Sequence, residues 1–157
     1  MLPTLPISMD SVGSDQVHSL TIGGWNTWTT WHLIPKERPF VKPPNVKMEF
    51  IDIPGSDITL DYTESIDENI HYKNREGSWT FIMVPDGESV LSRYSTIMNT
   101  IHGKHLTIVC SDDPDYRYSG RVWVGEPKSE DNYTTITISY NVDPYKYLIS
   151  DPTQKRL

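Results

Sequence analysis

Cysteine is almost absent from this chain of 157 residues, which contains only Cys110. An intrachain disulfide is therefore impossible, and a zinc site built from several cysteines is excluded. Cys110 ends the apolar run 106–110, a setting typical of a small buried hydrophobic residue, and a reactive nucleophile is the alternative. We predict the buried role.

Long hydrophobic runs are also missing. No apolar stretch approaches the roughly 18 residues that a membrane-spanning helix needs. The N-terminal residues 1–6 include prolines and lack the charged start and long apolar core of a signal peptide. We therefore expect a soluble protein that is made in the cytoplasm and does not contact a membrane.

Positive charge is scarce, because 14 Lys and Arg residues stand against 21 Asp and Glu residues and give a net charge of −7. A protein that clasps nucleic-acid phosphates needs a basic patch, so such a function is disfavoured. A protein that lets DNA slide past without holding it is compatible with this charge. No acidic block dominates the sequence, so most of the charge is expected on a solvated surface.

The motifs of common enzymes are missing as well, since we find no nucleophile elbow, phosphate-binding glycine loop or metalloprotease helix. The acidic cluster 111–115 does not fit an EF-hand calcium loop, which requires a glycine at its sixth position and a glutamate at its last. His102 and His105 are separated by Gly103 and have no third ligand nearby. We predict no catalytic residues, no metal and no cofactor; a hydrolase without a recognisable motif is the enzymatic alternative.

One amphipathic helix is predicted over about residues 87–102. Its apolar side chains recur every three or four positions and form one stripe, while Arg93 falls on the polar side. Asp86 is a candidate N-cap, and Gly103 can adopt the left-handed turn that ends a helix. The helix residues expected in the core are Leu91, Tyr94, Ile97, Met98 and Ile101.

The rest of the chain shows strand patterns rich in threonine, aromatic and β-branched residues. Segment 58–62 alternates like a half-buried strand. Segment 78–84 has apolar side chains at both odd and even positions, so both faces of this strand are expected to be covered and we predict a central strand under the helix. A turn is expected to pair it with the strand at 70–73. The predicted strands are 17–22, 25–34, 47–53, 58–62, 70–73, 78–84, 104–110, 116–124 and 132–142.

These elements predict a mainly β (α+β) fold, a two-sheet β-sandwich or barrel with one helix. The length suits one domain over residues 1–157, with an extended N-terminal arm at 1–16 and a short C-terminal tail at 148–157. The aromatic residues expected in the core are Trp31, Trp79 and Phe81.

Three tryptophans, Trp25, Trp28 and Trp31, lie within seven residues. They could form a platform on which sugar rings stack, which makes a carbohydrate-binding module an alternative function. Such a platform needs exposed indoles in one row, yet Trp28 has the opposite strand parity to the other two. A role in the core or in a subunit interface is therefore favoured.

The segment 35–44 contains four prolines among charged residues and is expected to be an extended connection within the domain. A stiff excursion of this kind often reaches a neighbouring subunit; a plain surface loop is the alternative. Residues 63–69 form a second excursion, an acidic loop.

A series of short motifs resembles the N-terminal domain of distal tail proteins from long-tailed bacteriophages of Gram-positive hosts. The order and spacing of these motifs cover about residues 17–147, and the series is more specific than any member. It consists of Trp31-His-Leu-Ile-Pro-Lys-Glu-Arg-Pro39, Pro43-Pro44, Ile51-Asp-Ile-Pro-Gly-Ser-Asp57, Leu60-Asp-Tyr-Thr63, Tyr72-Lys-Asn-Arg-Glu-Gly-Ser-Trp79, Ile101-His-Gly-Lys104, Asp112-Asp-Pro-Asp-Tyr116 with Gly120-Arg121, and Asn141-Val-Asp-Pro-Tyr-Lys146.

The resemblance implies a fold of the phage tail-tube type and a structural role in the virion, at the tail tip. Six copies would form a ring that joins the tail tube above to the hub or baseplate below, with a lumen through which DNA passes unbound. An acidic lumen would repel phosphate. The family offers no catalytic residues to carry over. A tail-tube or hub subunit of related fold is the nearest alternative.

The subunit interface of such a ring is expected at the proline-rich connection 35–44 and in the acidic region 56–69, with Arg38 bridging to an acid of a neighbour. The candidate interface residues are Arg38, Pro39, Phe40, Pro43, Pro44, Asp57, Asp61 and Glu64. Many family members carry a second, carbohydrate-binding domain. The present sequence has no space for one, so direct adhesion to host sugars is not expected.

Overall fold

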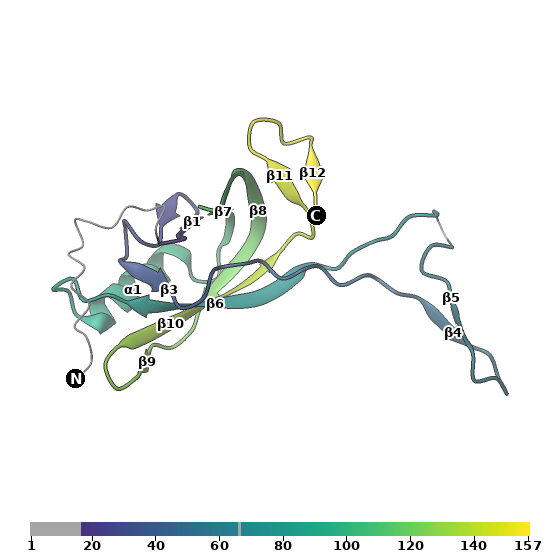
Figure 1. The fold of residues 1–157 in the computed structure, drawn as a ribbon, viewed down its shortest axis with the longest axis horizontal. Coiled ribbons are helices and arrows are strands. Elements are labelled where there is room, and N and C mark those ends of the chain that lie inside the picture. Colours follow the sequence, from purple (N-terminus) through teal and green to yellow (C-terminus); the bar gives the residue numbers. More distant parts are fainter. Residues whose placement is uncertain (1–16, 66) are drawn as a thin grey trace.

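The computed structural model describes residues 17–65 and 67–157; the N-terminal arm predicted at 1–16 lies outside the described residues. The described chain is mainly β with one helix, as the sequence predicted (Figure 1). Its elements are β1 (Leu20–Ile22), β2 (Trp25–Asn26), β3 (Leu33–Pro35), β4 (Phe50–Asp52), β5 (Thr59–Asp61), β6 (Arg75–Met83), α1 (Val90–Ile101), β7 (His105–Cys110), β8 (Asp113–Val124), β9 (Lys128–Ser129), β10 (Thr134–Val142), β11 (Lys146–Leu148) and β12 (Lys155–Arg156).

A curled antiparallel sheet forms the body, with strand order β2-β1-β7-β8-β10-β6-β3. Strand β10 shows why the core forms here: Ile136, Ile138, Tyr140 and Val142 alternate with polar residues, and all four are buried. The inner faces of β1, β3, β6, β7, β8 and β10 share one hydrophobic cluster with the helix. Trp31, Trp79 and Phe81 belong to that cluster.

The helix α1 begins one turn later than predicted, and its N-cap is Ser89, whose side chain accepts a hydrogen bond from the Ser92 N–H. The predicted cap, Asp86, instead accepts a bond from the Glu88 N–H and contacts the side chains of His32 and Arg93, as described below. At the other end Gly103 has φ of +74°, the left-handed conformation that the sequence predicted.

The buried face of α1 differs from the predicted stripe. Ile97 and Ile101 are buried, and Tyr94 and Met98 pack half-buried against the core. Leu91, predicted to lie in the core, is 70% exposed. Residues spaced by four lie on one face, so Arg93 shares the inner face with Ile97 and Ile101, while Leu91 projects from the opposite side.

The predicted strand 25–34 is interrupted, because residues after Asn26 make a helical turn before β3 begins. Thr30 N–H donates to Asn26 O and His32 N–H donates to Trp28 O. The Asn26 side chain starts this turn by accepting bonds from the N–H groups of residues 28 and 29. As a result Trp28 and Trp31 turn into the protein, and only Trp25 remains partly exposed.

Strands β4 and β5 form a two-stranded hairpin that projects far from the body (Figure 1). We call residues 47–73 the arm. The sequence predicted β5 to be half-buried, but all of β4 and β5 is exposed because no second layer from residues 17–65 or 67–157 covers the hairpin. The predicted pairing of 70–73 with 78–84 is also wrong. Strand β6 continues through the expected turn, and Tyr72 instead bridges to Val46 at the base of the arm.

Strand β6 lies between β10 and β3, and the helix packs mainly against β8, not against β6 as predicted. The residues predicted as a short C-terminal tail contribute to a further hairpin. Strand β12 pairs with β11, which pairs with β8 through Tyr147 and Arg117.

Candidate subunit interface

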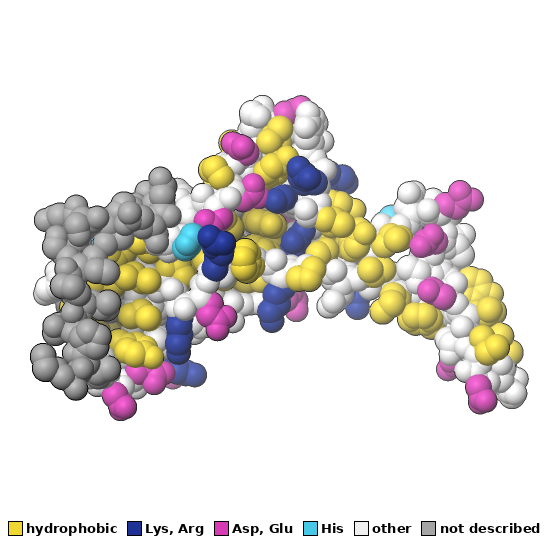
Figure 2. Space-filling model, viewed as in Figure 1, with side chains coloured by type: hydrophobic (Ala, Val, Ile, Leu, Met, Phe, Trp, Pro, Cys, Tyr) yellow, Lys and Arg dark blue, Asp and Glu magenta, His cyan; other side chains and the backbone are white. Residues whose placement is uncertain are grey.

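The arm carries an unusual concentration of exposed apolar side chains. Figure 2 shows hydrophobic and acidic side chains together on this projection. A two-stranded hairpin is marginally stable in water by itself, and contiguous apolar surface of this kind usually marks a contact with another molecule. The exposed apolar residues of the arm are Met48, Phe50, Ile51, Ile53, Ile58, Leu60, Tyr62 and Ile70.

A groove of about 430 Å³ lies on the body, between β6 and the proline-rich segment that follows β3. Its floor includes Trp79 and Tyr140, whose rings stack with centroids 4.2 Å apart. Trp79 Nε1–H donates to Phe40 O, and Lys42 N–H donates to the Tyr140 hydroxyl oxygen, so the segment is held at both aromatic rings. Three cations, Lys36, Arg38 and Lys42, line the groove with one acid, Glu37.

The candidate interface residues fall in two separate places. Arg38 and Phe40 line the groove, and Phe40 is 69% exposed. Pro43 is exposed and Pro44 half-buried beyond the groove, whereas Pro39 is buried within the chain and offers the least surface of the set. The acidic candidates Asp57, Asp61 and Glu64 are all exposed on the arm. Within one chain the structure does not bring the two groups together (Figure 1).

Arg38 also has partners in its own chain. Its Nε lies 3.4 Å from Asp112 Oδ2, and Asp112 Oδ1 lies 2.7 Å from His18 Nδ1. These groups are about one-third or more exposed, so water screens them and the pairs contribute little to stability. The guanidinium is therefore available to exchange its partner for an acid of another molecule.

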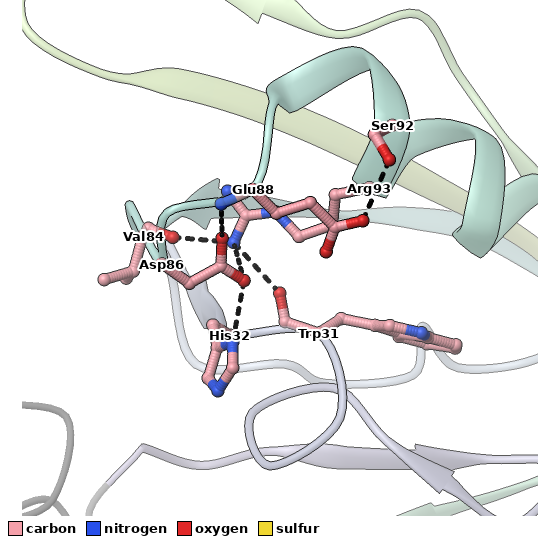
Figure 3. Close-up of polar contacts among 7 residues, drawn as sticks. All are labelled: Trp31, His32, Val84, Asp86, Glu88, Ser92 and Arg93. Atoms are coloured by element: carbon pink, nitrogen blue, oxygen red, sulfur yellow. Dashed lines mark hydrogen bonds and ion pairs between the residues drawn. The ribbon is translucent and has the colours of Figure 1, made fainter.

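A buried polar cluster joins the helical turn at residues 26–32, which we call the tryptophan turn, to the start of the helix (Figure 3). The Arg93 side chain is 3% exposed, and its Nη1 donates to Trp31 O and to Val84 O and lies 3.4 Å from Asp86 Oδ2. His32 Nδ1, 2.9 Å from the same carboxylate oxygen, holds Asp86 from the other side. The cluster fixes the entry to α1 against the tryptophan turn.

The ionisation of Asp86 follows from these contacts. Burial raises the pKa of its carboxyl, but the hydrogen bonds from His32 and from the Glu88 N–H, with the charge of Arg93, outweigh burial and lower the pKa below its ordinary value. Asp86 is therefore a carboxylate that compensates the buried Arg93. Nearby Ser92 donates to Glu88 and not to His32, so no nucleophile–base pair forms here.

Sequence reasoning missed this cluster because it assigned Arg93 to the polar face of the helix. The spacing of Arg93, four residues before Ile97 and eight before Ile101, was the available signal.

Other candidates for chemistry find structural partners. Burial, with the nearby charges of Asp113 and Asp112, raises the pKa of the Cys110 thiol to about 11, so it is a poor nucleophile. In the acidic cluster 111–115, Asp112 pairs with His18 and Asp113 with Lys146. Within residues 17–65 and 67–157, no group of three or more His, Cys, Asp or Glu side chains could hold a metal ion. No helix in the described part of the chain is long and apolar enough to cross a membrane.

No protein-family model matches the sequence, and no curated protein sequence matches it significantly. Among solved structures, the chain is similar to the Dit protein (gp 19.1) of phage SPP1, described as a paradigm of the hub adsorption apparatus in phages that infect Gram-positive bacteria. The TM-score is 0.62 at 21% identity, and the match covers 84% of this chain and 52% of that one. The chain thus spans about half the length of the Dit protein and has a Dit-like fold.

Proposed function

We propose that this chain is a structural subunit of a phage or phage-derived tail, and that six copies form a ring at its distal end. The ring joins the tail tube above to the hub or baseplate below, and DNA passes through its lumen. The Dit-like fold supports this proposal. So does the order of family motifs in the sequence. The role is structural and not enzymatic, and the body and arm act as one domain.

The strongest support for assembly is the exposed arm. One copy presents the arm on one side and the groove on its body, so the contact between copies is head-to-tail. Head-to-tail contacts that repeat with a fixed rotation close into a ring. Pairing the exposed edges of the arm with another subunit also removes an aggregation hazard.

The overall charge suits a channel for DNA. The net charge of −7 disfavours binding to the phosphate backbone. If acidic residues face the lumen, DNA is repelled from the wall and slides without stalling.

Negative-stain electron microscopy combined with native mass spectrometry tests the ring. We expect six-fold rings with an open centre and a native mass of six chains. A matched control is the chain in which residues 47–73 are replaced by a short Gly-Ser linker. This variant should remain monomeric and keep the circular dichroism spectrum of a folded β protein.

Other outcomes separate the alternatives. Rings that stack into long tubes without a partner would favour the related role of a tail-tube subunit. A monomer that binds glycans would instead support a carbohydrate-binding module. That result would be surprising, because two of the three clustered indoles are buried.

A further inference from the structure

Strand β6 has an outer edge that is only partly covered. Its inner edge pairs with β10 over the whole strand, from Arg75 to Met83. On the outer edge β3 pairs with only three residues, and the last main-chain bond runs from Lys36 N–H to Thr80 O. After Lys36 the chain leaves the edge and forms the far wall of the groove.

The register shows which main-chain groups remain free at this edge. Gly125 N–H donates to Thr137 O, so Thr137 turns its main-chain groups toward β8. Because antiparallel ladders alternate, Ile138 and Tyr140 bond to Trp79 and Gly77 of β6. Residues 76, 78 and 80 of β6 therefore turn their main-chain N–H and C=O groups outward. Among residues 17–65 and 67–157, none makes a main-chain bond to the outward groups of Glu76 or Ser78.

An open strand edge beside a groove can accept an additional strand from another segment. Main-chain hydrogen bonds to the edge then provide affinity, and the side chains that line the groove provide specificity. Here the specificity groups are the cations Lys36, Arg38 and Lys42 and the exposed ring of Phe40. The groove therefore fits an extended segment that carries acids and apolar side chains.

The arm has this composition. Residues 47–73 contain seven Asp and Glu side chains and two lysines, a formal charge of −5 out of −7 for the whole chain. The acids are interspersed along the hairpin with the exposed apolar residues described above. Both strands of the hairpin have one edge free of other described strands, since β4 and β5 pair with each other in a two-stranded sheet.

We infer that the groove beside β6 receives the arm of a second copy, which adds a strand to the sheet at Glu76 and Ser78. This inference rests on the proposed ring. The arm of the same chain projects far from the body that carries the groove, so the occupant comes from a neighbour (Figure 1). Arg38 exchanges Asp112 for an acid of the incoming arm, and Phe40 contacts its apolar residues.

Zero-length carbodiimide cross-linking tests the contact, because this reagent joins a lysine to a carboxylate only when they touch. Unlabelled chain is mixed with ¹⁵N-labelled chain at high concentration, and cross-linked peptides are identified by mass spectrometry. We expect mixed-isotope links from Lys36 or Lys42 to acids of the arm. Rings whose links avoid the groove would overturn the inference and leave the ring intact. A chain with no intermolecular links at any concentration would count against both.

Reversing the charges of the groove and of the arm tests the same contact without a cross-linking reagent. Lys36→Glu with Arg38→Glu should abolish assembly, and so should Asp57→Lys with Asp61→Lys. The four substitutions together should restore it. The matched control Lys128→Glu, at an exposed position on β9, should assemble normally. If each pair abolishes assembly and the four together fail to restore it while each variant stays folded, the arm and groove do not meet.

Hydrogen exchange tests the added strand itself. The amides of Glu76 and Ser78 should exchange slowly in the ring and rapidly in the monomeric Asp57→Lys/Asp61→Lys variant. Equal exchange in the two states would contradict strand addition.

Discussion

At the scale of single residues, the most informative side chain is one that the hydrophobic pattern placed wrongly. Arg93 is buried on the inner face of α1, where the two oxygens of Val84 and Trp31 and the carboxylate of Asp86 compensate its charge. A buried charge with good hydrogen bonds is tolerated, but it becomes costly when one partner is removed. The cluster is therefore a point at which small changes have large effects.

We predict that Asp86→Asn destabilises the protein by about 3 kcal/mol at neutral pH, the lower end of the loss when one partner of a buried ion pair is removed. Asn keeps the shape of Asp86 and removes the charge that faces Arg93 and His32. Urea unfolding followed by tryptophan fluorescence measures the change. The matched control is Asp151→Asn at the surface, whose pKa is also lowered, by hydrogen bonds from Thr153. A loss no larger than that of this control would contradict the role of Asp86.

The loss of stability caused by Asp86→Asn should depend on pH. The pKa of Asp86 is lower in the folded protein than its ordinary value of 3.8, so its stabilising effect is complete above that value. The effect is lost as the pH falls through the folded pKa. Native protein and the Asn variant should therefore differ by a constant amount at neutral pH and converge only below about pH 4. Convergence well above pH 4 would contradict this assignment to Asp86.

Trp31→Ala is predicted to cost about 3–5 kcal/mol, because truncation of a buried aromatic side chain leaves a cavity in the core. Trp31 is 3% exposed. Its carbonyl bond to Arg93 survives the substitution, so the loss reports the indole alone. Thermal unfolding is the measurement, with the half-exposed Trp25→Ala as control. An unchanged melting temperature would contradict the buried position.

At the scale of elements, the burial of a strand was predicted correctly from the sequence where other parts of the same chain cover its apolar face. Strand β10 and the helix stop at Gly103 were predicted because alternation and glycine conformation are local signals. Strand β5 alternates equally well but is exposed, because no second layer covers its apolar side chains within the described residues. The tryptophan segment failed for another reason: the side-chain bonds of Asn26 convert a strand-like sequence into a turn.

The candidate site was predictable only in part. Proline and charge patterns singled out Arg38, Phe40 and the acids of the arm, because such residues have no place in a core. The groove itself depends on β3 leaving the edge of β6 at Lys36, and this is a property of the sheet register that no local pattern encodes.

The close approach of β8 and β10 gives a prediction at the same scale. A Cβ added to Gly120 would lie 2.2 Å from Asn141 O and 2.4 Å from Val142 Cα, both main-chain atoms that cannot move aside easily. Gly120→Ala should therefore destabilise the protein by about 1–3 kcal/mol, the usual cost of overpacking. Gly125→Ala, directly after β8 and beside Thr137 of β10, is the control, since its closest contact would be 3.3 Å and the loss should be smaller. Urea unfolding curves of equal slope should give a lower midpoint for Gly120→Ala than for Gly125→Ala. Equal losses of stability in the two variants would contradict the predicted clash.

At the scale of the whole molecule, the body and the arm have opposite roles. The body has one continuous core of buried apolar residues and is expected to fold without a partner. The arm leaves its apolar residues in water and contributes little to the stability of the monomer. Folding and assembly should therefore respond to different substitutions.

We predict that Phe50→Ser combined with Leu60→Ser prevents ring formation and leaves the melting temperature of the monomer unchanged. Both side chains are exposed on β4 and β5, so their removal creates no cavity in the chain that carries them. If they are buried between copies, each substitution removes a contact worth about 1.5–3 kcal/mol per fully buried side chain, and the loss repeats at every contact of the ring. Analytical ultracentrifugation measures assembly and calorimetry measures monomer stability. The matched control is Leu91→Ser, which is also exposed but lies on the helix and should change neither quantity. A lower melting temperature of the Phe50→Ser/Leu60→Ser monomer would show that the arm folds back on its own body, and unimpaired rings would show that other surfaces hold the copies together.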